Sequence, residues 1–172
     1  MEKALKQAKS LAKTLLKQVK AGDKEALLRF KKHYRNEKLC AETIKLVQCQ
    51  HCIASEIGFD DWQQLQCLLC GIPNGLTPRF GTLFHSGRCD YFINKWFANY
   101  PEAQANLNSG DYLVPYQQQF IVVRSHYLDA LGIKDMHQLS NFDNDLTKAY
   151  PSDTWDCLVA QIFAAKRQQY LS

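Results

Sequence analysis

The sequence predicts a mainly α, bundle-like protein, and three observations support that prediction. Apolar residues recur at spacings of three and four over several long stretches, which is the helical period. Glycine, proline and capping residues separate these stretches. The composition is globular, since 46% of the 172 residues are hydrophobic and 22% are charged, and this excludes an extended disordered chain.

The first two helices are predicted over residues 2–21 and 24–34. Apolar residues of the first helix fall on one arc, and lysines fall on the opposite side. Gly22 fits the C-terminal end of the first helix, and Asp23 fits the N-cap of the second. The lysine side, called the lysine stripe below, consists of Lys3, Lys6, Lys9, Lys13, Lys17, Lys20 and Lys24.

Two more helices are predicted before residue 71. One spans residues 41–57 and ends at Gly58. Asp60 and Gln63 have the spacing of a capping box for the next helix, which carries its apolar residues up to Leu69. Residues 1–70 are therefore predicted to form a basic helical subdomain.

Part of this subdomain resembles a known family. The matching stretches are AGDKEALLRF at residues 21–30 and CQHCIASEIGFDDWQQL at residues 49–65. They resemble a short helical module found near the N-terminus of many bacterial proteins, often ahead of ankyrin repeats, and the likeness covers about residues 5–70. The resemblance implies a helical packing unit without an activity of its own. Cys49 and Ser55 depart from its pattern, and no ankyrin-type repeat follows.

Residues 71–78 contain two glycines and two prolines and are predicted to be a linker. Residues 79–172 are predicted to be a helical body that packs on the first subdomain. Its expected helices lie after Asp90, from Pro101 to about residue 108, over 115–131, within 134–148, and from Ser152 or Asp153 to about residue 170. The run Phe120–Val123 is strand-prone, so a short strand or hairpin near 112–123 is the alternative.

The charge is concentrated near the N-terminus. Residues 1–38 hold 12 Lys and Arg against 4 Asp and Glu, whereas residues 71–172 hold 8 against 9. The lysine stripe therefore predicts either a solvated helix face or binding of nucleic acid or an acidic partner. The candidate binding residues are Lys6, Lys13, Lys17 and Lys20.

The cysteines allow two interpretations. Cys49, Cys52, Cys67 and Cys70 form two C-x-x-C pairs whose spacing is close to that of a four-thiolate zinc site. Both pairs lie within apolar helical periods, which favours buried structural thiols and no metal. Zinc, or a redox pair, is the alternative.

The loop Arg79–Asp90 has the densest set of reactive side chains. His85 is a candidate general base or ligand, Cys89 a candidate nucleophile, and Arg88 a candidate anion clamp, with Asp90 and Arg79 beside them. Arg79 and His85 also fit a loose R-x5-H pattern that some small helical ribonucleases share. The alternative to a reactive site is an ordinary loop whose polar side chains cap helices.

Three function classes follow. The first is a cytoplasmic protein-interaction or adaptor module with an exposed aromatic patch. The second is a nucleic-acid or acidic-partner binder. The third is a small enzyme or metal protein centred on residues 79–90 or on the paired cysteines. No apolar run is long enough for a membrane span, and no signal peptide is recognisable. The residues expected in the aromatic patch are Trp96, Tyr112, Tyr116 and Phe120.

Overall fold

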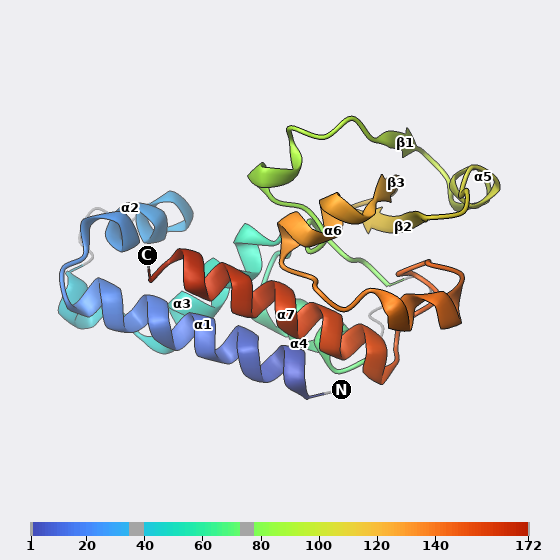
Figure 1. Ribbon diagram of the computed structural model, residues 1–172. Helices are drawn as coiled ribbons and strands as arrows, with labels where there is room; N and C mark the ends of the chain where they lie inside the picture. The colour runs from blue at the N-terminus through green and yellow to red at the C-terminus, as the bar shows by residue number, and fades with distance from the viewer. Residues whose placement is uncertain (1, 35–39, 73–77, 172) are drawn as a thin grey trace.

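The computed structural model describes residues 2–34, 40–72 and 78–171. Within these ranges the chain is mainly α-helical and carries a small three-stranded antiparallel sheet. Figure 1 shows long helices on one side of the molecule and the sheet with two short helices on the other. No helix in these ranges is long and apolar enough to cross a lipid bilayer.

The first two helices form as the apolar period predicts. Helix α1 spans Lys3–Lys20 and α2 spans Lys24–His33. The Asp23 side chain accepts a hydrogen bond of 2.8 Å from the Ala26 amide and caps α2. Six apolar residues of α1 are buried and Leu5 and Leu16 pack partly buried against the same core, while the lysine stripe is exposed along its whole length.

The next two helices are shorter than the sequence suggests. Residues 41–43 form a 3-10 turn, η1 (Ala41–Thr43), and α3 begins only at Leu46 and ends at Glu56. Helix α4 spans Trp62–Leu69, and Asp61 rather than Asp60 caps it, because its carboxylate accepts the Gln64 amide at 2.8 Å.

The last helix packs beside the first. Helix α7 spans Asp153–Gln169 and runs parallel to α1, as Figure 1 shows. Near its start, the buried Asp156 carboxylate accepts the backbone amides of Glu2, Lys3 and Ala4 at 2.9–3.0 Å. The amides at the start of α1 have no acceptor within their own helix, and they therefore find one on a helix more than 150 residues away in the sequence.

The helix predicted over 115–131 is wrong, and the alternative hairpin is present. Strands β2 (Asp111–Tyr116) and β3 (Gln119–Arg124) pair antiparallel, and only Ser125–Leu131 is helical, as α6. Val114 and Ile121 belong to the main core on one face of the sheet. Leu113 and Val122 are buried on the other face, which α5 (Tyr100–Ala105) contacts. Burial of both faces removes the alternation that marks a strand in the sequence.

The helix predicted after Asp90 is also wrong. Residues 87–89 form the 3-10 turn η2 (Gly87–Cys89), a loop follows, and Lys95–Phe97 is the edge strand β1. The strand order is β1-β3-β2, with Trp96 opposite Ile121. The segment 134–148 contains one 3-10 helix, η3 (His137–Phe142). The body 79–172 is therefore mixed rather than purely helical.

The predicted boundary at 71–78 does not separate two cores. Residues 73–77 lie outside the described residues, but one hydrophobic cluster runs from Ala4 to Phe163 and includes side chains from both sides of the boundary. Phe84, for example, packs edge-on against Trp155 of α7 at 6.3 Å.

A glycine holds the loop after this boundary in place. Gly81 has φ +55°, and a Cβ there would lie 2.2 Å from the Ile57 carbonyl oxygen. The next amide, Thr82 N–H, donates to that oxygen at 2.7 Å, and the Gly81 carbonyl accepts from the Gln117 amide at 2.7 Å. The loop is thus clamped between the end of α3 and the hairpin turn, and this positions Arg79 and His85.

Candidate functional site

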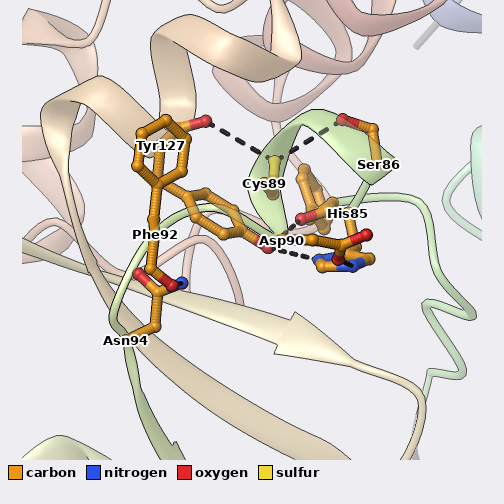
Figure 2. Close-up of polar contacts among 8 residues, drawn as sticks. His85, Ser86, Cys89, Asp90, Phe92, Asn94 and Tyr127 are labelled. Carbon is orange, nitrogen blue, oxygen red and sulfur yellow. Dashed lines mark hydrogen bonds and ion pairs between the residues drawn. The ribbon is translucent and has the colours of Figure 1, made fainter.

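His85 is the centre of the polar network shown in Figure 2. Its Nδ1 lies 2.8 Å from the Tyr127 hydroxyl on α6, and its Nε2 lies 3.0 Å from an Asp90 carboxylate oxygen. The Tyr127 hydroxyl also donates to the Phe84 carbonyl at 3.1 Å. We call His85, Asp90 and Tyr127 the His85 latch.

The two contacts of the Tyr127 hydroxyl restrict how the latch is connected. If this hydroxyl donates to the Phe84 carbonyl, its oxygen accepts from Nδ1 of His85; if it donates to Nδ1, the Phe84 carbonyl loses this donor. Burial raises the pKa of the Tyr127 phenol well above its usual value, so this hydroxyl keeps its proton in both arrangements.

Two rings of the sheet also lie edge-on to the His85 imidazole. Tyr116 of β2 lies edge-on at 5.1 Å between ring centroids, and Trp96 of β1 lies at 6.4 Å. The His85 side chain is 19% exposed, whereas Asp90 is 66% exposed. A substrate would reach Nε2 only by displacing Asp90, so the arrangement fits a structural tie between the loop, the sheet and α6 better than an open general base.

The other residues of the loop do not converge on His85. Cys89 is buried, and its thiol lies 4.0 Å from the Tyr127 carbonyl as donor and 3.5 Å from the Ser86 hydroxyl. This position suits a core thiol rather than a nucleophile that faces a substrate. Arg88 is exposed. Within the described residues, no hydrogen bond or ion pair joins Arg79 or Arg88 to His85.

The four paired cysteines lie on two helices. Cys49 and Cys52 are fully buried on α3, and Cys67 and Cys70 at the end of α4 are partly buried. Among the described residues, one group has ligand atoms close enough together to share a metal ion, and it is His33, Cys52 and Glu56, within 4.8 Å. The four-thiol set is not gathered in this way.

The His33 group is occupied by an ion pair. Arg29 donates to both carboxylate oxygens of Glu56, and its guanidinium lies 3.4 Å from the centroid of the Tyr170 ring. Burial lowers the pKa of His33, whose Nε2 is 4.0 Å from Glu56. A cation here would compete directly with Arg29, so the group fits a bridge between α2, α3 and α7 better than a metal centre. Zinc at the four paired cysteines stays the untested alternative of the sequence analysis.

The buried thiols have a measurable signature. Burial raises the pKa of Cys49 to about 11 and that of Cys52 to about 12, so both remain neutral thiols at ordinary pH. Because the thiolate is the reactive form, we expect Cys49 and Cys52 to resist iodoacetamide at pH 8 while exposed Cys40 is alkylated. Mass spectrometry of the digested protein measures this. Equal labelling of Cys40 and Cys52 in the folded protein would contradict the burial.

The lysine stripe is exposed along α1. The side chains of Lys6, Lys13, Lys17 and Lys20 all face solvent, on the side away from α7 and α3. The stripe contains no arginine or aromatic ring, which nucleic-acid surfaces commonly add for bidentate and stacking contacts. Binding of nucleic acid or an acidic partner there stays a prediction.

Sequence reasoning missed two features near the loop. Tyr127, the second partner of His85, is 42 residues away in the sequence, and no spacing pattern connects them. Tyr91 and Ile93 are 88% and 103% exposed, whereas the predicted helix placed Ile93 on its buried face. Residues 91–96 read Tyr-Phe-Ile-Asn-Lys-Trp, with no alternation of apolar and polar residue types, so no periodic signal in the sequence distinguishes the exposed side chains from the partly buried ones.

The comparisons with known proteins add no assignment. No protein-family model, curated protein or solved structure matches this chain.

Proposed function

We propose that this protein is a protein-interaction module that binds an extended peptide of a partner through residues 91–97. The observation that carries the proposal is the exposure of three large apolar side chains within six positions. Tyr91 and Ile93 are almost completely exposed, and Trp96 is 47% exposed. Clustered exposure of this kind is costly in water and is typical of interaction surfaces.

The segment is held in shape from both sides. The His85 latch precedes it, and β1 pairs with β3 through residues 95–97. Between them, the Phe92 ring packs against the His126 ring at 4.7 Å between centroids, and Nδ2 of the Asn94 side chain donates to the Phe92 carbonyl at 3.0 Å. A surface that is already ordered loses little conformational entropy on binding.

The edge of the sheet suggests the form of the occupant. Strand β1 pairs with β3 on one side, and no strand among the described residues pairs with its other side. The opposite edge, β2, is partly covered by a parallel bridge between Leu113 and Asp145. A strand added to β1 would satisfy its outward backbone groups. Arg88 and Lys95 are exposed nearby, and this favours a peptide with acidic as well as apolar side chains.

The test is selection of random linear peptides on the immobilised protein. We expect peptides enriched on the wild type to lose about tenfold or more in affinity for the double variant Tyr91→Ser and Ile93→Ser, because these side chains are exposed anchors that folding does not need. Bound peptide should also slow amide exchange at Lys95–Phe97. The matched control is Leu28→Ser, which removes a 70% exposed side chain on α2 and should leave binding unchanged.

Two outcomes would contradict this proposal. One is enrichment that is the same on the double variant as on the wild type. The other is concentration-dependent dimerisation that the double variant abolishes, which would assign the segment to contacts between copies of this chain.

The proposal includes a cytoplasmic setting for the protein. All seven cysteines are free thiols, and free thiols are usual in a reducing compartment. The same proposal includes the likeness of residues 5–70 to a bacterial helical module. In it, residues 5–70 are a helical packing unit without an activity of its own, and residues 91–97 bind the partner.

A further inference from the structure

A cleft lies at the end of the hairpin, among residues outside the proposed peptide-binding segment. Its volume is about 590 Å³, which is within the range of small-molecule sites. Its walls come from four elements that are distant in the sequence: the loop at Arg79, the start of α5, the β2–β3 turn and the segment at Thr147.

The body of the cleft is apolar and aromatic. Tyr100 and Phe120 pack edge-on with ring centroids 5.5 Å apart, and Phe80 and Pro115 are buried beside them. Aromatic and apolar walls of this kind favour a ligand with a flat apolar body over a hydrated ion.

Arg79 supplies a cation at this cleft. Its side chain is exposed, and within the described residues it has no ion pair or hydrogen bond to another side chain. The side chains of Gln117, Gln118 and Gln119 line the same cleft, placed there because the Gln117 amide binds the Gly81 carbonyl. An adjoining cleft also includes Arg79, but it contains the carboxylate of Asp60, which disfavours an anion on that side.

Two hydroxyl groups on the cleft wall already donate their protons in hydrogen bonds to Asp145. The Tyr100 hydroxyl donates to buried Asp145 at 2.7 Å, and the Thr147 hydroxyl donates to the other oxygen of the same carboxylate at 2.5 Å. Burial and the bond to Asp145 raise the pKa of Tyr100, so its proton stays in place. Each hydroxyl has only acceptor capacity left for a ligand.

We propose that this cleft binds a small hydroxyaryl carboxylate. The carboxylate pairs with Arg79 and the glutamine amides, the ring lies between Phe80, Tyr100 and Phe120, and the ligand hydroxyl donates to the oxygen of Tyr100 or Thr147. The proposal does not depend on the peptide site, which lies on β1 and uses none of these side chains.

Isothermal titration of the full chain with para-hydroxyphenylacetate and the longer para-hydroxybiphenyl carboxylate tests the proposal. We expect saturable binding of at least one of these probes. Phenylacetate, which lacks the hydroxyl, and para-hydroxyphenylethanol, which lacks the carboxylate, should each bind more weakly by about tenfold. Inorganic phosphate tests for a bare anion site.

The matched pair of variants is Arg79→Gln and Arg88→Gln. Both remove an exposed arginine of the same loop region, and only Arg79 lines the cleft. We expect Arg79→Gln to lose about tenfold or more in affinity for the bound probe and Arg88→Gln to keep it. No binding of either probe, equal loss in both variants, or displacement of the probe by phosphate at comparable concentration would overturn the proposal.

Discussion

Replacing Gly81 by alanine is expected to destabilise the protein by roughly 3–5 kcal/mol, or to prevent folding. Two costs add at this position. The residue has φ +55°, which costs an L-residue about 1–2 kcal/mol, and the new Cβ would lie 2.2 Å from the Ile57 carbonyl oxygen. Relief of that clash requires the loop to move away from α3 and breaks the bond from Thr82 to Ile57. Urea unfolding followed by circular dichroism measures the loss.

Gly110→Ala separates the two costs. Gly110 has φ +81°, and nothing lies within 4 Å of a Cβ built there, so this variant should lose only the backbone part, about 1–2 kcal/mol. If both alanine variants unfold at the same urea concentration, the close approach of residue 81 to the Ile57 carbonyl oxygen adds no cost, and the prediction is wrong.

Replacing Asp156 by alanine is expected to cost about 3 kcal/mol. The carboxylate accepts three backbone amides at the start of α1 and is itself in the first turn of α7. Its negative charge therefore lies between the positive ends of two parallel helices, and removal leaves buried donors without an acceptor. The melting temperature should fall by roughly 6–12 °C, measured by thermal denaturation.

Asp156→Asn provides the graded control. The amide keeps one acceptor oxygen but loses the charge and the second oxygen, so the loss should be intermediate between wild type and Asp156→Ala. Amide exchange at Lys3 and Ala4 should accelerate in the alanine variant before exchange in α4 does. Unchanged exchange at Lys3 and Ala4 would show that Asp156 does not cap α1.

Local patterns predict the long helices well. The apolar arc of α1, the caps at Asp23 and Ser152, and the proline in the first turn of α5 all depend on neighbours within one helical turn. Such signals are visible in the sequence because the interactions that produce them are local.

The strands were harder to predict for a physical reason. Phe120 to Val123 has apolar side chains at every position because α5 covers one face of the sheet and the main core covers the other. A continuous apolar run is compatible with a buried strand or a buried helix, and the decision depends on pairing with residues that only the fold brings alongside.

The loop Arg79–Asp90 also shows what local patterns can predict and what depends on long-range contacts. The sequence correctly singles out residues 79–90 as a concentration of polar side chains, but it does not indicate that they separate in space. His85 and Asp90 join Tyr127, Cys89 enters the core, and Arg79 faces the hairpin cleft.

By itself, the sequence determined the helical N-terminal half, the final helix and the exposed lysine stripe, because each depends on a repeat along one helix. Only the tertiary structure decided the partners of Asp156, His85 and Arg29 and the exposure of Tyr91 and Ile93. These depend on contacts between residues that are distant along the chain, and the free energy of such contacts leaves no periodic trace in the sequence.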